Sequence, residues 1–493
     1  MGDMDIALDF DPESSTPLYR QLYDSFKAGI LDGRFAAGTK LPATRELARS
    51  IGVSRITVTE CYERLLAEGY IEARRGSGTF VCKRLPELSL FASPSPAAAP
   101  ETPAANLLPH LSRFGTAVNM LLNRPSIPGI IRLDLHGPDV AHFPRKVWAR
   151  LIAKRMGRSG RDLFDYAFDS RGDPALRNAL ARYLAQARAV LCDPDQILIV
   201  SGSQQAISLT ARILLNEGDR VAMESPGYYY AGRTFTSQGA EVVPISVDHH
   251  GIKVSELQKH KDIRMVYVTP SHQFPTGAAL TLPRRKALLA WARANNALIL
   301  EDDYDSEFRY RERPLPALQG IEPDAPVIYS GSFSKLLFPS LRLGYLVIPK
   351  QLYLPFRTAK VLADLQSSTF HQHILADFLI EGHLESHLRR MRTLYDKRRS
   401  ILVRVLREHF GSKVTIFGDE AGMYLLARFR TNLTEQEAWE RAHDAGVRTD
   451  RLYWPPGASE TQHGYVRLVF AYATVSEKEL QVAGRRLARA FLD

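Results

Sequence analysis

A lysine set among small hydroxyl side chains is the pattern in this sequence that most directly suggests covalent chemistry. Lys335 ends the run Ser332-Phe333-Ser334-Lys335, and Arg342 follows on the same segment. A lysine amine can form a Schiff base with a carbonyl compound. An arginine binds phosphate through charge-assisted hydrogen bonds. Together these residues suit a phosphate-bearing cofactor that is held through an imine to Lys335.

Two other polar segments each follow an apolar run that reads as a buried strand. The segment 201–205, Ser-Gly-Ser-Gln-Gln, follows the run 197–200 and opens a helical pattern. Backbone N–H groups at a helix start form a ready anion site. The segment 301–304, Glu-Asp-Asp-Tyr, follows the run 297–300. Each signal is weak alone, because small residues often cap helices and acids are common at strand ends.

The elements that must position these residues alternate between strand and helix from about residue 110 onward. Apolar runs at 197–200, 221–223, 263–268, 297–300 and 327–329 predict buried strands, and 207–215 and 284–294 predict helices between them. Such alternation predicts an α/β domain with a mostly parallel sheet and helices on both faces. Ligands of such sheets bind at the carboxyl ends of the strands, where the polar residues fall.

Residues 14–84 predict a separate, small α+β module. A helical pattern over 18–30 and a short one over 44–50 are followed by a helix capped by Ser54. The expected inner face of this third helix is Val58, Tyr62, Leu65 and Leu66. Two strand-like segments, 70–73 and 79–81, flank a basic tip with glycines at 76 and 78. Two helices joined by a tight turn and followed by a basic hairpin make a winged helix-turn-helix.

This module resembles the GntR family of DNA-binding domains over nearly its whole length. The resemblance rests on L-P-A-T-R-E-L-A-R-S-I-G-V-S-R-I-T-V and L-L-A-E-G-Y-I-E-A-R-R-G-S-G-T-F-V. It implies that Arg45 contacts phosphate or a base edge, that Ser54, Arg55 and Thr57 lead the recognition helix, and that Gly76 lets the wing approach the minor groove. The alternative is that these are exposed helix-start residues with no ligand.

The larger module resembles the fold type I, aspartate-aminotransferase-like, enzymes that use pyridoxal 5′-phosphate (PLP). The order of phosphate loop, acid, lysine and arginine carries the resemblance. It implies that Lys335 forms the Schiff base with PLP and that Asp302 pairs with the pyridinium nitrogen. It further implies a hydrogen bond from Tyr304 to the phenolic oxygen, stacking by Tyr228, phosphate contacts from Ser203, Gln204, Ser332 and Arg342, and a clamp on an effector carboxylate by Arg467.

Two departures from the aminotransferase pattern bear on turnover more than on PLP binding. Ordinary aminotransferases carry asparagine in an N-P-T-G turn, whereas here the turn is Phe274-Pro275-Thr276-Gly277. The hydrogen bond from that asparagine to the phenolic oxygen is therefore absent. In addition, Tyr304 follows Asp302 by two positions, where many of these enzymes have three.

Both modules and their order resemble the MocR/GabR subfamily of bacterial transcription regulators. The motifs H-Q-F-P-T-G, E-D-D-Y-D-S-E-F and S-F-S-K-x-x-x-P-x-L-R-x-G-Y support this, as does a Pro/Ala-rich linker at 85–109 before the module at 110–493. The resemblance implies a head-to-tail, domain-swapped homodimer that binds double-stranded operator DNA and senses a small amine, an amino acid or PLP itself. Physiological turnover is not expected. An active aminotransferase with a DNA-binding appendage, and a regulator with a cofactor-free relic domain, remain alternatives.

Composition places the chain among ordinary globular proteins. Of its 493 residues, 45% are hydrophobic and 24% charged, and the net charge of +10 permits nucleic-acid binding without showing it. No apolar run approaches the ~20 residues of a membrane-spanning helix. The three cysteines, Cys61, Cys82 and Cys192, are far apart and suggest neither a disulfide framework nor a metal site. We therefore expect a cytoplasmic protein with no membrane partner.

Overall fold

The computed structural model describes residues 10–11, 14, 16–74, 76–83, 85, 111–118, 129–134, 137–158, 163–166, 169–310, 315–454 and 464–492. The chain divides into two compact units, Met1–Pro109 and His110–Asp493, which are described separately. The linker predicted at 85–109 lies outside the described residues apart from Leu85.

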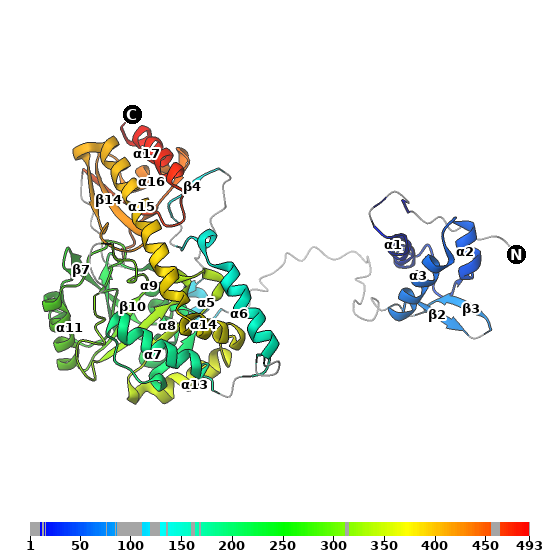
Figure 1. Ribbon diagram of the computed structural model, residues 1–493, viewed down its shortest axis with the longest axis horizontal. Helices are drawn as coiled ribbons and strands as arrows, with labels where there is room; N and C mark the ends of the chain where they lie inside the picture. Colours follow the sequence, from blue (N-terminus) through cyan, green and yellow to red (C-terminus); the bar gives the residue numbers. More distant parts are fainter. Residues whose placement is uncertain are drawn as a thin grey trace. The chain divides into compact units, whose positions relative to one another are not determined.

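The first unit is a winged helix-turn-helix, as predicted. Its helices are α1 (Leu18–Leu31), α2 (Thr44–Ser50) and α3 (Arg55–Ala67), and its antiparallel sheet has the order β1-β3-β2 (Lys40–Leu41, Gly78–Val81, Ile71–Arg74) (Figure 1). The buried side chains of α3 are Val58, Cys61, Tyr62 and Leu65. Leu66 is 36% exposed, so its predicted place on the inner face is wrong. Neighbouring helix positions point about 100° apart, and Leu65 already occupies the inner direction.

The second unit is built on an eight-stranded mixed sheet with the order β5-β12-β11-β10-β9-β6-β7-β8. Strands β11, β10, β9, β6 and β7 run parallel, whereas β12 and β8 are antiparallel to their neighbours. The prediction of a mostly parallel sheet is therefore confirmed. The strands are β5 (Ile197–Val200), β6 (Arg220–Ser225), β7 (Glu241–Asp248), β8 (Gly251–Ile252), β9 (Ile263–Val268), β10 (Leu298–Asp303), β11 (Val327–Ser332) and β12 (Gly344–Val347).

Helices cover both faces of this sheet because its strands are apolar on both sides. In β9, Met265 and Tyr267 join one core cluster while Val266 and Val268 join another. The helices of this part are α6 (Arg145–Arg158), α7 (Pro174–Arg188), α8 (Ser203–Leu214), α9 (Tyr229–Ser237), α10 (Val254–Leu257), α11 (Leu282–Ala294), α12 (Phe333–Leu336), α13 (Tyr353–Asp364) and α14 (Thr369–Ile380), with the short α5 (Arg113–Val118) before them.

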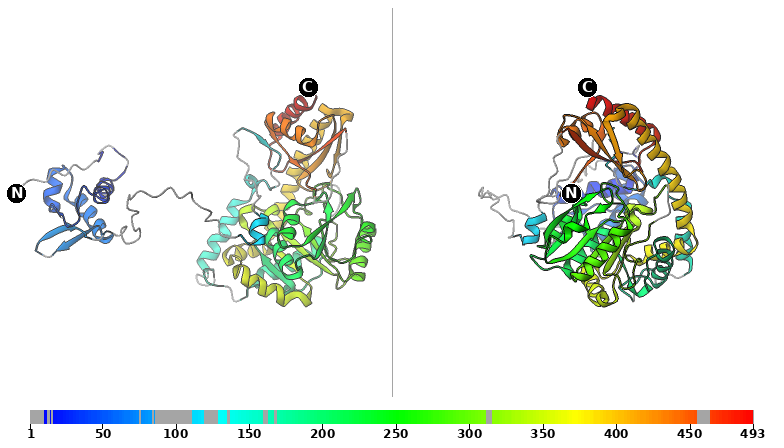
Figure 2. Two further views of the ribbon diagram at one scale, coloured as in Figure 1. Left: turned by 180° about the vertical axis from the view of Figure 1, so that it is seen from behind. Right: turned by 90° about the vertical axis from the view of Figure 1, so that its left-hand side faces the viewer.

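A second, four-stranded sheet forms the C-terminal part of this unit. Its order is β13-β14-β17-β16 (Val414–Phe417, Tyr424–Arg430, Tyr465–Ala471, Asp450–Arg451), and β15 (Val447–Arg448) pairs with β4 (Ile131–Arg132). Helices α16 (Glu435–Asp444) and α17 (Glu477–Leu492) pack near it. The long helix α15 (His383–Phe410) runs along one side of the unit and links the two sheets (Figure 2).

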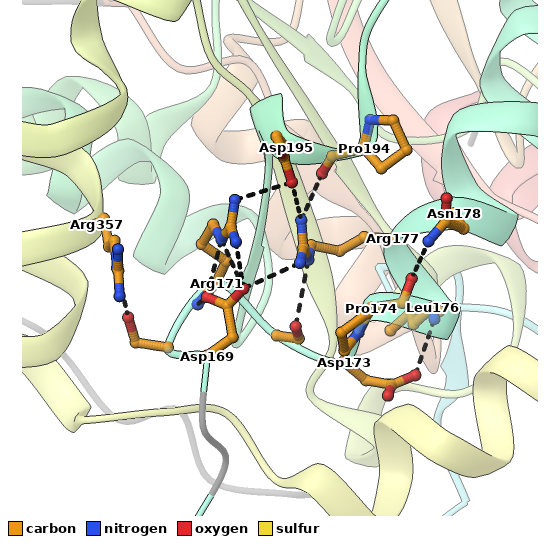
Figure 3. Close-up of polar contacts among 12 residues, drawn as sticks. Asp169, Arg171, Asp173, Pro174, Leu176, Arg177, Asn178, Pro194, Asp195 and Arg357 are labelled. Atoms are coloured by element: carbon orange, nitrogen blue, oxygen red, sulfur yellow. Dashed lines mark hydrogen bonds and ion pairs between the residues drawn. The ribbon is translucent and has the colours of Figure 1, made fainter.

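An ion-pair cluster anchors the start of α7 to the chain before β5 (Figure 3). The buried guanidinium of Arg177 contacts Asp169 at 3.0 Å and Asp195 at 3.1 Å. Arg171 contacts the same two acids, and its carbonyl accepts a hydrogen bond from the N–H of Ile199 in β5. This network fixes β5, whose far end leads into the segment 201–205. Among the described residues, no helix has the length and apolar character needed to cross a lipid bilayer.

Candidate functional site

Five of the residues singled out from the sequence line one cavity at the carboxyl ends of the parallel strands. The cavity has a volume of about 710 Å³, and these five residues are Ser203, Tyr228, Asp302, Tyr304 and Lys335. They come from four separate segments, each of which follows a strand of the large sheet. Parallel strands end at one edge of the sheet, so residues far apart in the chain meet there.

Lys335 lies on the short helix α12, near buried acids at the end of β10 and just after it. Burial lowers the pKa of its amine to about 8, and the nearby carboxylates of Asp305 and Asp302 oppose that shift. An ordinary lysine is almost wholly protonated at neutral pH, whereas one with a pKa near 8 is partly neutral. A neutral amine is the nucleophilic form, so Lys335 is suited to attack a carbonyl group.

Asp302 is a buried carboxyl group with one oxygen engaged. Burial raises its pKa to about 6, and the hydroxyl of Tyr267, which donates to Oδ2 at 2.7 Å, opposes that shift. Within the part of the chain that the structure describes, Oδ1 has no hydrogen-bond partner. A buried oxygen of this kind is costly unless a donor reaches it. A protonated ring nitrogen in the cavity would supply such a donor.

The start of α8 and the guanidinium of Arg342 form a small cradle. Gly202 has φ +119°, and a Cβ there would lie 3.5 Å from the Arg342 guanidinium. Gly344 packs against the same backbone, since its Cβ would come within 2.8 Å of the Gly202 Cα. Arg342 itself has φ 50°, in the left-handed region. Glycines at both positions therefore let the arginine and the helix N-terminus approach one point, which suits a phosphate.

Two residues predicted to bind phosphate have protein partners at this end. The Ser332 hydroxyl caps α12 by accepting from the N–H of Ser334 at 3.2 Å. The amide of Gln204 donates to the hydroxyl of Thr234 at 2.6 Å. Neither residue lines the cavity, whereas Ser203 does.

Arg467 lies outside the set of cavity-lining residues. Its Nε is 3.0 Å from Glu435 of α16, and its guanidinium stacks on Trp454. Two arginines of the neighbouring strands do line the cavity: Arg448 of β15, whose Nε is 2.9 Å from Asp134, and Arg451 of β16. Arg448 was not singled out from the sequence, because β15 gives no motif that marks it.

The aromatic wall of the cavity joins the two sheets. Phe274 packs at 6.0 Å from the Tyr228 ring and at 5.3 Å from the ring of Tyr424, the first residue of β14. Tyr424 and Asp305 both line the cavity and were both missed by the sequence analysis. Asp305 stood within a recognised motif, but nothing local marks Tyr424, since its place depends on the packing of the C-terminal sheet.

A second cavity, of about 720 Å³, lies at the opposite ends of the strands. It is lined by residues such as Cys192, Asn296 and Val327, and by none of the predicted site residues. The cavity that holds Lys335 is therefore the one with a set of groups suited to chemistry.

The winged helix presents four of its predicted DNA-contacting residues on exposed positions, and the fifth, Thr57, is half-buried. Arg45 and Arg55 are exposed at the starts of α2 and α3. The Ser54 hydroxyl accepts from the Thr57 N–H at 3.1 Å and so caps α3. Gly76 has φ +77°, which a wing turn requires of glycine. Ile56, 78% exposed beside Arg55, is a further surface residue that the sequence analysis missed.

Fold and site together define a winged-helix DNA-binding unit combined with a fold type I aminotransferase-like unit. Residues 18–81 match the gntR family of bacterial regulatory proteins, and residues 139–487 match the aminotransferase class I and II family. The chain belongs to the GntR-family transcription regulators of the MocR type, which carry both parts, and it is therefore a regulator that binds operator DNA.

Individual relatives share both parts of the chain or the larger one alone. "Probable rhizopine catabolism regulatory protein MocR" of Rhizobium meliloti is 39% identical over 98% of this chain and 95% of its own length. The pyridoxine biosynthesis transcriptional regulator PdxR of Corynebacterium glutamicum is 33% identical over 82% of this chain and 81% of its own. The structure of Pyrococcus horikoshii kynurenine aminotransferase in complex with PMP is 26% identical, with a TM-score of 0.71 over 78% of this chain and 98% of that one.

Proposed function

We propose that this regulator holds PLP on Lys335 and uses it to sense a small amine or amino acid, so that the occupied cavity changes how the winged helix binds DNA. The observation that carries the proposal is the buried Lys335 amine, with a pKa of about 8, facing Asp302 in one cavity. When bound, PLP supplies an aldehyde that captures amines reversibly and a ring that withdraws electrons.

The residues in and around the cavity suit this cofactor at five points. Lys335 is the covalent attachment point, and the unpartnered Oδ1 of Asp302 is suited to accept from a ring N–H. The cradle of Ser203, Gly202 and Arg342 suits the phosphate, with Ser332 and Gln204 holding the two segments around it. Tyr228 is suited to stack on the ring, and Tyr304 to donate to its phenolic oxygen.

Arg467 is proposed as the clamp for an effector carboxylate. Residues 467, 469 and 471 of β17 share one face, and Val469 and Ala471 pack there with Tyr424, Phe274 and Tyr304. Arg467 is thus on the cavity side of the C-terminal sheet, two residues along β17 from Val469. Its partner Glu435 is a carboxylate, and an effector carboxylate would replace it with two parallel hydrogen bonds.

The DNA-binding part of the proposal assigns base or phosphate contacts to residues at the start of α2, at the start of α3 and in the wing: Arg45, Ser54, Arg55, Thr57 and Gly76.

The regulator is proposed to act in the cytoplasm as a head-to-tail homodimer, so that two winged helices meet two half-sites. An effector shifts the balance between two arrangements of the dimer only by its difference in affinity for them. Closure around Arg467 and Lys335 would supply that difference.

Borohydride reduction tests the cofactor assignment. Reduction of the PLP-loaded protein should fix PLP on the peptide that contains Lys335, and Lys335→Ala should lose that adduct while still binding operator DNA. Lys360, a buried lysine on α13 paired with Asp364, provides the matched control through Lys360→Met, which should retain the adduct. PLP fixed on any lysine other than Lys335 would overturn the proposal.

An active aminotransferase with a DNA-binding appendage is the second candidate, and the complete set of Lys335, Asp302 and Tyr304 in one cavity favours it. The two functions differ in what becomes of the cofactor. Turnover would convert PLP into its amine form and release a keto acid, whereas a sensor would bind the amine reversibly. With an amino acid and a keto-acid acceptor both in excess, an aminotransferase should release many equivalents of the new keto acid per cofactor, because the acceptor returns the cofactor to its aldehyde form. A sensor should release at most one equivalent.

A further inference from the structure

The turn at Phe274 leaves one polar position of the cavity wall filled by a hydrocarbon ring. The ring of Phe274 lies 6.4 Å from the Tyr304 ring and 5.3 Å from the Tyr424 ring, edge-on to both. No side-chain donor can come from a phenylalanine. If the Tyr304 hydroxyl accepts a side-chain hydrogen bond on this side of the cavity, a residue other than Phe274 must donate it.

Tyr424 places a hydroxyl next to that of Tyr304. The two hydroxyl oxygens are 2.6 Å apart, both rings line the cavity, and both are nearly parallel, at 14°. The Tyr304 hydroxyl also lies 2.7 Å from the carbonyl of His272, and the Tyr424 hydroxyl 3.1 Å from the carbonyl of Gln273. The Tyr304 oxygen also lies 3.4 Å from His272 Nδ1. Two hydroxyls with two protons therefore share two backbone acceptors, this ring nitrogen and one another.

The proton count allows three arrangements of this pair. In the first, each hydroxyl donates to a backbone carbonyl. In the second, Tyr304 donates to Tyr424. In the third, Tyr424 donates to the Tyr304 oxygen, and the Tyr304 proton can point at a ligand in the cavity. A hydroxyl that accepts one hydrogen bond becomes a stronger donor in the next. The third arrangement therefore strengthens Tyr304 as a donor toward the cavity.

The pair is held firmly enough for this arrangement to be specific. Gly422, two residues before Tyr424, has φ +80° and packs so closely on the His272 ring that a Cβ would come within 2.0 Å of it. His272 in turn contacts Asp305 at 3.1 Å. Tyr424 is 2% exposed. The C-terminal sheet thus reaches the cavity through a tightly packed segment that ends at the Tyr424 hydroxyl.

We propose that Tyr424 is a positioning residue that directs the Tyr304 proton at the cofactor's phenolic oxygen, and so takes over the polar support that Phe274 does not give. The proposal rests on the function proposed above, in which PLP is attached to Lys335. It also gives β14 a direct hydrogen-bonded link to the cofactor, so that a shift of the C-terminal sheet changes the electronic state of the cofactor.

The test is a pH titration of the visible absorbance of the lysine-bound cofactor in the full-length protein. A hydrogen-bond donor to the phenolic oxygen draws negative charge away from that oxygen. The oxygen then stabilises the proton on the lysine–cofactor nitrogen less well, so loss of the donor raises the apparent pKa of that nitrogen. Tyr304→Phe should raise that pKa by about one unit, and Tyr424→Phe by a few tenths of a unit. Tyr424→Phe added to Tyr304→Phe should change it no further, because the second hydroxyl acts through the first.

Tyr472→Phe is the matched control. Tyr472 is also fully buried, and its hydroxyl donates to the carbonyl of Gly422 at 2.8 Å, but it does not line the cavity. It should leave the titration unchanged. The role of Tyr424 would be overturned if Tyr424→Phe titrated as the parent does. It would also be overturned if Tyr424→Phe caused its full shift in the Tyr304→Phe background. Either result would leave the proposed function standing. Absence of PLP from Lys335 in the parent would overturn the proposed function together with this inference.

Discussion

Four buried carboxyl groups of the larger unit, among them Asp302 of the cavity, hold their protons more tightly than free carboxyls do. Burial raises the pKa of Glu224, Glu301 and Glu307 to about 7 and that of Asp302 to about 6. Between pH 4.5 and pH 7 the folded chain therefore binds more protons than the unfolded chain. Stability contributed by these groups is fully present at low pH and is lost as pH rises through the folded pKa values.

Glu224→Gln should remove one part of this pH dependence. The Glu224 Oε2 accepts from the N–H and hydroxyl of Thr269 and from the Gln273 amide, and a glutamine oxygen can take the same bonds. We expect the variant to gain on the order of 2–3 kcal/mol relative to the parent between pH 5 and pH 8. Thermal unfolding across that range measures it. Glu440→Gln, at an exposed position, should show the same change of stability with pH as the parent. If the stability of Glu224→Gln also changed with pH as that of the parent does, Glu224 would not titrate in this range.

Arg55 and Ile56 are expected to make different contributions to operator binding. Arg55→Ala should cost on the order of 1–3 kcal/mol if the guanidinium reads a base. Ile56→Ser should cost less and relax preference for thymine, whose methyl group suits an apolar side chain. Sequencing of DNA selected from a random library, followed by titration at fixed salt, checks both. Arg55→Ala that binds the selected operator as tightly as the parent would contradict the placement of α3.

At the scale of elements, the cap of α3 has a stability role that can be separated from DNA binding. The Ser54 hydroxyl satisfies the Thr57 N–H, and replacing such a cap by alanine costs about 1 kcal/mol. Ser54→Ala should therefore speed hydrogen exchange of the first-turn amides roughly fivefold. Ser54→Asn, which can also cap, should restore slow exchange. Unchanged exchange in Ser54→Ala would show that packing alone holds this turn.

At the scale of the whole molecule, Arg467 should decide which effectors the protein senses. Arg467→Lys cannot form two parallel bonds to a carboxylate, so it should keep PLP on Lys335 yet bind amino acids more weakly, with simple amines little affected. Titration of cofactor absorbance and operator binding together measures this. Arg430→Lys, at an exposed position on the same sheet, is the control. Equal amino-acid affinity in Arg467→Lys and the parent would remove Arg467 from the site and favour PLP itself as the effector.

Local sequence determined the elements and the class of protein. Apolar runs specify β5, β6, β9, β10 and β11 because the greater part of a strand buried on both faces is apolar. Glycines and caps mark the ends of α3 because those positions need special backbone geometry or a side-chain acceptor. The motifs at 272–277, 301–308 and 332–345 fall at strand ends, so the topology brings them into one cavity without further information.

Only the tertiary structure decided which side chains from the C-terminal sheet reach that cavity. Tyr424 and Arg448 line the cavity, whereas Arg467 does not line it and forms an ion pair with Glu435. These positions depend on how β14, β15 and β17 pack against strands more than a hundred residues earlier in the chain. Periodicity gives the face of a strand on which a residue lies, but contact across two packed sheets depends on register and packing distance, which no local pattern encodes.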